Sequence, residues 1–265
     1  MAELPFFAPF TLAFRNMRTR LGRTLLTLTG IVLGVAVVLA IQVTNRSTLD
    51  SIRRVFDRAA GRASLLVVPA SQGGDELDQD LMDEIAHAPG VVNAAPLVQV
   101  PTLLANEAGS WQIAFTINGL ASGNVLQLYG IDPEIDPLVR VYALTAGRMP
   151  EHGRYETVLP ARYAAQKNLN LGDELVVISP QGEGRMEIVG LLAEEGVALL
   201  NDGAVAFAPL DVVQDLFLRG VELDEIALQV QTEISEDIYQ LQATRQRLAD
   251  EVGRGGRVIY PAARG

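Results

Sequence analysis

An uncharged apolar run near the N-terminus constrains this chain more than any other feature. Residues 25–43 (LLTLTGIVLGVAVVLAIQV) comprise 19 residues without a single charged side chain. A helix of that length spans about 28 Å, close to the roughly 30 Å hydrocarbon core of a bilayer. Uncharged runs this long are rare among the buried helices of soluble proteins. The run therefore predicts a transmembrane helix over 25–43.

Charge is distributed unevenly on the two sides of this run. Residues 1–24 hold four arginines and one acid, which give this segment a net charge of +3. Because the whole chain has a net charge of −11, the other 241 residues carry −14. Lysine and arginine collect on the cytoplasmic side of membrane helices. We therefore expect a cytoplasmic N-terminus and place residues 44–265 outside the cell (inner or plasma) membrane. The acidic balance also excludes broad nucleic-acid binding, which needs a cationic surface.

A cleaved signal peptide is the main alternative for the same run. It shares the basic flank and the apolar stretch, and Val38-Leu39-Ala40 could serve as a cleavage site. However, the run is longer than the usual signal-peptide core, and 24 residues precede it. A retained helix is favoured. The alternative, cleavage near Ala40, would release a secreted enzyme, for which the sequence offers no nucleophile or metal constellation.

Two small residues within the run indicate a helix–helix contact. Gly30 and Gly34 form a GxxxG pair, which lets a neighbouring helix approach closely.

The segment before the run also has helical periodicity, with apolar residues on one face and arginines off that face. The apolar face carries Phe10, Phe14, Met17 and Leu21. Arg15 and Arg18 lie off that face, and Arg23 comes just before the apolar run. This pattern predicts a short amphipathic helix at the cytoplasmic interface; a plain basic flank is the alternative.

Beyond the run, the pattern predicts an α+β extracytoplasmic domain on a stalk helix at 44–60. Residues 61–131 fit β-α-β-β and residues 221–265 fit β-α-β, so we expect these ends to form one discontinuous α+β subdomain. Residues 132–220 are expected to form an inserted β-rich subdomain. The expected strands are 64–68, 91–104, 111–118, 125–131, 156–159, 174–179, 186–192, 204–207, 225–231 and 257–260, and the expected helices are 78–87, 161–168, 209–218 and 235–252.

The sequence holds no recognisable catalytic or metal-binding motif. Cysteine is absent, and neither His87 nor His152 has a second histidine at metal-ligand spacing. No GxxxxGK[ST] motif is present, so the chain does not bind ATP phosphates in the P-loop manner. Acid pairs such as Asp224-Glu225 are expected on a solvated surface, and Asp136-Pro137 is typical of a turn. We expect no catalytic site, no cofactor and no metal.

Residues 12–40 resemble the start of the first membrane helix in ABC transporter permeases of the MacB/FtsX/LolE type. The resemblance rests on Arg15, Asn16, Arg23, Leu25, Leu26, Thr27, Gly30, Ile31 and Gly34. Short motifs farther along are similar to the extracytoplasmic core domain of the same family. They supply Gly130, Asp132, Gly147, Arg148, Gly172, Asp173 and Gly190. We expect these family-motif residues to form turns rather than substrate contacts.

The resemblance implies a permease that dimerises, as a homo- or heterodimer, and pairs with a separate cytoplasmic ABC ATPase. Nucleotide-driven movement would pass through the membrane helices to the exterior domain, for export or extraction of lipoproteins, peptides or small molecules. Family members return to the membrane after that domain, but no second apolar run of 18 residues occurs here. We therefore expect a fragment or a half-permease. The alternative is a single-span, membrane-anchored binding or sensor module.

Overall fold

The computed structural model describes residues 26, 29–37, 61–70, 77–105, 125–253 and 255–261. The chain divides into two units, Met1–Ile52 and Arg53–Gly265, and each is described by itself. The predicted interfacial segment and the predicted stalk at 44–60 lie outside the described residues.

In the first unit, residues 29–37 are helical and their side chains are exposed. Gly30 and Gly34 lie in this helix, and a Cβ atom added to either would meet nothing within 4 Å. No helix within the described part of the chain is both long enough and apolar enough to cross a membrane. The transmembrane helix expected at 25–43 therefore stays a prediction.

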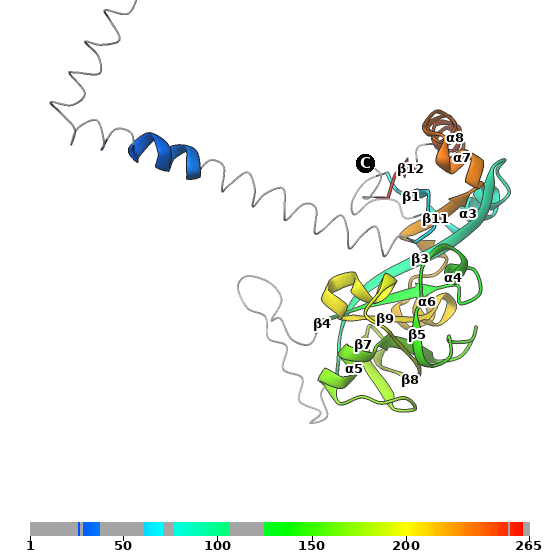
Figure 1. Ribbon diagram of the computed structural model, residues 1–265. Coiled ribbons are helices and arrows are strands. Elements are labelled where there is room, and N and C mark those ends of the chain that lie inside the picture. Colours follow the sequence, from blue (N-terminus) through cyan, green and yellow to red (C-terminus); the bar gives the residue numbers. More distant parts are fainter. Residues whose placement is uncertain are drawn as a thin grey trace, which may run out of the picture. The chain divides into compact units, whose positions relative to one another are not determined.

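The second unit is built on a ten-stranded mixed sheet, counted over the described residues (Figure 1). The strand order is β12-β1-β11-β3-β4-β9-β6-β8-β5, and β7 pairs with β8 off this path. The strands are β1 (Leu65–Pro69), β3 (Val91–Leu103), β4 (Val125–Ile131), β5 (Leu144–Gly147), β6 (Glu156–Pro160), β7 (Glu174–Ser179), β8 (Gly182–Leu192), β9 (Val205–Pro209), β11 (Glu225–Val230) and β12 (Gly256–Ile259). A separate two-stranded sheet joins β2 (Leu77–Asp78) to β10 (Glu222–Leu223).

Helices pack against both faces of the large sheet. They are α3 (Gln79–Ala86), α4 (Asp136–Val139), α5 (Ala161–Lys167), α6 (Leu210–Phe217), α7 (Thr232–Glu236), α8 (Ile238–Val252) and the 3-10 segment η1 (Gly196–Gly203). Helices α3, α5, α6 and α8 bury apolar side chains in the main core with alternate residues of the strands. The opposite face carries two smaller clusters, one with Val139 of α4 and one with Val197 of η1. The period-two alternation of the strands thus separates the two faces.

The far end of β3 closes part of the sheet on itself. Leu104 forms a bridge to Val177 of β7, and the Ala105 amide donates to the Val176 carbonyl at 3.0 Å. The Thr102 hydroxyl donates to the Ile178 carbonyl at 2.7 Å. Strands β3, β4, β9, β6, β8 and β7 therefore form a closed ring, which protects the free edge of β7. Since β4 pairs with β9, this ring joins the two predicted subdomains, and their boundaries at 131 and 220 stay a prediction.

The predicted α+β class is confirmed as a mixed, sheet-rich α/β domain, and most predicted elements are present. The prediction of one helix over 235–252 is wrong, because the chain breaks between α7 and α8. Asp237 caps α8 by accepting hydrogen bonds from the Tyr239 amide at 2.8 Å and the Gln240 amide at 3.2 Å. The short elements α4, β5 and η1 have no predicted counterpart. The strand predicted at 111–118 lies outside the described residues.

Candidate functional site

Two motif glycines pack backbone against backbone where β5 meets β8. Gly147 pairs with Gly190 across these strands. A Cβ atom on Gly147 would lie 2.1 Å from the Val189 carbonyl oxygen, and one on Gly190 would lie 2.3 Å from the Arg148 carbonyl oxygen. Gly147 also has a φ of +77°, which disfavours any other residue. The pair therefore sets the path of the loop that follows β5.

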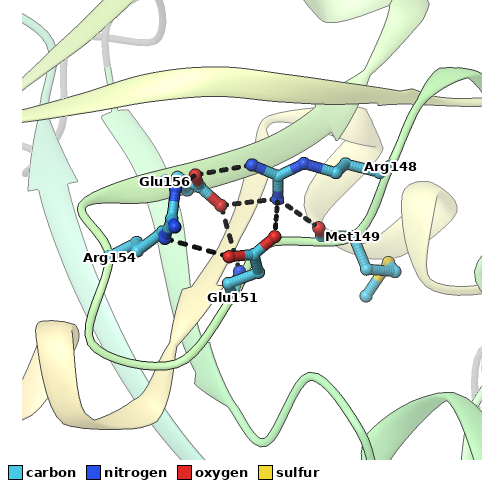
Figure 2. Close-up of polar contacts among 5 residues, drawn as sticks. All are labelled: Arg148, Met149, Glu151, Arg154 and Glu156. Carbon is cyan, nitrogen blue, oxygen red and sulfur yellow. Dashed lines mark hydrogen bonds and ion pairs between the residues drawn. The ribbon is translucent and has the colours of Figure 1, made fainter.

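Arg148 holds that loop through a two-pronged ion pair with Glu156 (Figure 2). Both guanidinium nitrogens, Nη1 and Nη2, lie 2.7 Å from a carboxylate oxygen of Glu156. The Glu151 amide donates to the same carboxylate at 3.0 Å, and Arg154 Nη1 lies 3.8 Å from it. The Glu156 side chain is only 7% exposed. These bonds to the charged form, led by those from Arg148, lower the pKa of Glu156.

Replacing Glu156 with glutamine is expected to cost about 1.5–3 kcal/mol of unfolding free energy at neutral pH, the usual range for a hydrogen bond to a charged group. Because the folded-state pKa is lowered, this stability is present above the ordinary glutamate pKa and is lost as the pH falls through the lowered value. Urea unfolding of both proteins between pH 7 and pH 3 would measure it. A gap between wild type and Glu156→Gln that does not shrink on acidification would contradict the prediction.

The remaining motif residues also lie at turns and close contacts. A Cβ atom on Gly130 would lie 2.9 Å from Val213 Cβ, since α6 packs directly on β4 at this point. Asp132 Oδ1 accepts from the amides of Glu134 and Ile135, each at 2.9 Å, and so shapes the turn into α4. One motif residue thus allows α6 to pack closely on β4, and another shapes the turn that follows β4.

Gly172 and Asp173 form the turn between α5 and β7. Gly172 has a φ of +88°, and its amide donates to the Ile188 carbonyl at 2.8 Å. Asp173 Oδ2 accepts from the Asn170 amide at 2.7 Å. The structure therefore does not gather the seven motif residues into one pocket. Gly130 and Gly190 lie inside strands β4 and β8, so the prediction that these two form turns is wrong: each is a glycine because another element packs closely on it.

A buried ionic cluster lies elsewhere, at residues the sequence analysis did not select. Arg140 is 8% exposed, and its guanidinium donates to Asp136 and, at 2.6 Å, to Glu225 Oε1. The Tyr142 hydroxyl donates to the second oxygen of Asp136. Burial raises the pKa of Asp136, while Arg140 and Tyr142 act against that shift. Asp136, Arg140, Tyr142 and Glu225 are called the Arg140 cluster below.

The Arg140 cluster corrects two predictions. Asp136 is fully buried inside a short helix rather than in an exposed turn. Glu225 is half of a largely buried ion pair rather than part of a solvated surface, and Asp224 accepts a hydrogen bond from the Gln99 amide at 2.6 Å. The i,i+4 spacing of Asp136 and Arg140 was a usable signal. No local pattern points to Glu225, which lies 85 residues away.

The cluster lies beside Gly61 and Arg62, the first described residues of the second unit. The Arg62 amide donates to the Val139 carbonyl at 2.7 Å, and a Cβ atom on Gly61 would lie 2.7 Å from the same oxygen. Farther on, the Val141 carbonyl accepts from Val197 of η1 at 3.2 Å. The segment containing the cluster therefore links the first residues of the domain to η1.

A groove of about 560 Å³ opens beside the cluster on the same face of the sheet. Its floor includes Tyr129 and Phe207, whose rings stack with centroids 5.2 Å apart. Arg140 and Glu225 reach its wall. No group of three potential metal ligands occurs among the described residues, and His152 lies 3.4 Å from Asp132 alone.

Comparisons with known proteins agree with this architecture. The family model described as the MacB-like periplasmic core domain matches residues 24–246. The crystal structure of the periplasmic region of MacB from Actinobacillus actinomycetemcomitans is 12% identical, with a TM-score of 0.53 over 77% of this chain and 91% of that one. The extracellular domain of the noncanonic ABC-type transporter YknZ from Gram-positive bacteria is 11% identical, with a TM-score of 0.51 over 74% and 99%. At these identities the structural likeness concerns the fold alone, and the comparison with curated proteins found no match.

Proposed function

Because the chain belongs to the family of MacB-like periplasmic core domains, we propose that it couples a separate cytoplasmic ABC ATPase to the outside of the membrane. In this proposal it is the extracytoplasmic domain of an ABC-type permease, together with the first membrane helix, and is itself non-catalytic. The observation that carries the proposal is the family match over residues 24–246, which begins at the apolar run and includes every strand of the large sheet except β12.

Two features of the described residues support a membrane anchor. The helix at 29–37 exposes large apolar side chains, and Leu33 is 64% exposed. A bilayer would bury this surface without any further protein contact. In the second unit, β12 runs antiparallel to β1, so that Ile259 pairs with Leu66. The start of β1 and the end of β12 therefore lie at the same end of this strand pair, as suits a domain held to a membrane from one side.

Cysteine labelling would test the proposed topology, because the chain has no cysteine of its own. Ala8→Cys reports on the N-terminal segment, and Gln242→Cys reports on an exposed position of α8. In intact spheroplasts, a membrane-impermeant maleimide is expected to label Gln242→Cys fully and Ala8→Cys only after permeabilisation. Labelling of Ala8→Cys from outside, or protection of Gln242→Cys, would contradict the proposed orientation.

Co-purification would distinguish the proposed permease subunit from a single-span binding module. A permease subunit is expected to bring a cytoplasmic ATPase with the full chain, whereas a binding module is not.

Replacing both Gly30 and Gly34 with leucine is expected to reduce assembly with a partner membrane helix about tenfold, because close approach of two helices needs small residues. Neither leucine would meet an atom of the described chain at its Cβ position, so a loss would report on another helix. Disulfide crosslinking in membranes would measure assembly, and carbonate extraction would check that insertion is unchanged. The matched control replaces Val32 and Val35 with leucine; equal effects in both double variants would rule out a specific glycine contact.

A further inference from the structure

The groove beside the Arg140 cluster crosses several strands of the large sheet. Its lining comes from β1, β3, β4, β9, β11 and the end of β12, with Leu200 and Asn201 of η1 at one side. Leu66, Leu97 and Ile259 contribute aliphatic surface to it. The groove is therefore an apolar trough across the sheet with polar groups at defined positions.

The Tyr129 hydroxyl is the first of these polar groups. Tyr129 is 7% exposed, and its ring is held by stacking on Phe207, with an interplanar angle of 16°. The residue lines the groove, and its hydroxyl makes no hydrogen bond to another described residue and is not among the sealed, unpartnered polar atoms, so it is open to the groove. Burial raises the pKa of Tyr129 to about 12, so the group stays a protonated donor at physiological pH. A hydroxyl that is open to the groove can donate to an acceptor of a bound ligand.

Two glutamine side chains add neutral donors and acceptors. Gln99 of β3 lies opposite Tyr129 of β4, and Gln127 is two residues before Tyr129 on the same face of β4. The backbone amide of Gln99 donates to Asp224, and that of Gln127 donates to the Ala204 carbonyl. Neither side-chain amide is hydrogen-bonded to another described residue. A glutamine amide offers donors and an acceptor together, which matches the N–H and C=O of a peptide group.

The charge at the groove favours a cation. Arg140 already donates to Asp136 and Glu225, so it offers no unopposed positive charge to a ligand. With both acids ionised, these three side chains carry a net charge of −1. Glu225 is 19% exposed and accepts only from Arg140, through one of its two oxygens, among the described residues. An anionic ligand would also meet the strongly acidic remainder of the chain.

From these contacts we propose that the groove binds an extended peptide carrying a cationic side chain beside an apolar one. The peptide groups pair with Gln99, Gln127 and Tyr129, the cation faces Glu225, and the apolar side chain lies on the aliphatic wall. An apolar amine without peptide bonds would satisfy the charge but leave the two amides and the hydroxyl without partners. The proposal deepens the proposed transport function, on which it rests, by naming a class of cargo.

Titration calorimetry on the full chain in lipid nanodiscs would test the site. The probe is N-acetyl-Leu-Lys-Leu-amide, and the comparison ligands are N-acetyl-Leu-Glu-Leu-amide and hexylamine. We expect saturable binding of the lysine peptide and at least about tenfold weaker binding of both comparison ligands. Equal affinity for the glutamate peptide or for hexylamine would overturn the proposal, as would the absence of saturable binding of the lysine peptide.

Conservative variants locate the site. Tyr129→Phe removes one oxygen and keeps the ring stack, and it is expected to weaken the lysine peptide about three- to tenfold, as loss of one hydrogen bond does. Tyr155→Phe is the matched control, because that hydroxyl donates to Asp215 at 2.8 Å and lies outside the groove. Gln127→Leu should act like Tyr129→Phe. Unchanged affinity in both groove variants would overturn the assignment. Cysteine labelling needs no peptide, so failed binding with the expected topology would reject this inference alone.

Discussion

Replacing Arg140 with methionine is expected to lower the free energy of unfolding by about 3–5 kcal/mol, the range observed when one partner of a buried ion pair is removed. Asp136 has no exposed surface, and its two oxygens accept from Arg140 and Tyr142. Without the guanidinium, its charge would remain buried with only the tyrosine hydroxyl as a partner. Methionine fills much of the arginine volume, so the expected loss reflects charge rather than a cavity.

The pH dependence of this loss provides a second check. Burial holds the pKa of Asp136 above its ordinary value. A raised carboxyl pKa contributes stability at low pH, and that contribution is lost as the pH rises through the folded-state value. The Arg140→Met defect should therefore be largest at neutral pH and smaller in acid, where Asp136 takes up a proton. Urea unfolding of the full chain in detergent, followed by circular dichroism, would measure both.

Arg185→Met is the matched control for Arg140→Met. Arg185 pairs with Glu174 at 3.2 Å and Glu183 at 3.1 Å, but all three side chains are exposed. Water and salt screen exposed pairs, so this variant should unfold nearly like the wild type. Comparable losses of unfolding free energy in the two arginine variants would contradict the prediction that the buried ion pair of Arg140 stabilises the fold more than an exposed pair does.

Replacing Gly147 with alanine is expected to cost about 3 kcal/mol or more, because two penalties combine. The φ of +77° strains any residue with a Cβ, and that Cβ would lie 2.1 Å from the Val189 carbonyl oxygen and 2.9 Å from Gly190 Cα. Since both neighbours are backbone atoms, relief requires β5 to move away from β8. The displaced loop would also carry Arg148 away from Glu156.

Gly172→Ala separates the two penalties. Gly172 has a φ of +88°, yet a Cβ atom there would meet nothing within 4 Å. It should suffer only the backbone strain, of about 1 kcal/mol. Thermal unfolding of both variants, with protease sensitivity of the 148–156 loop as a local readout, would compare them. A Gly147→Ala protein as stable as Gly172→Ala would mean that the close approach of β5 and β8 is not required.

Local patterns were enough to predict several elements. Strands β4 and β7 were predicted with their observed bounds, because their apolar residues alternate and turn residues flank them. The break between α7 and α8 was missed although Asp237 is a good capping residue, because the helical periodicity runs across it. Helix α4 was missed because four residues beginning with Asp136-Pro137 look like a turn.

The candidate sites were likewise predictable only in part from the sequence. Gly147 and Gly172 stand out in the sequence because glycine tolerates turns that other residues do not, and the structure places both at positive φ. The Arg140 cluster and the groove beside it could not be predicted, since Glu225 and Tyr129 reach them from strands distant in the sequence. No periodicity encodes which strands become neighbours.

By itself, the sequence determined the apolar run at 25–43, the acidic balance of the remainder and the alternation of strands and helices, because these are properties of neighbouring residues. Only the tertiary structure decided that β3 returns to β7 and that Arg140 lies between Asp136 and Glu225. Only it placed Tyr129 over an open groove. These contacts join residues far apart along the chain, and packing of the whole sheet, rather than any local preference, selects them.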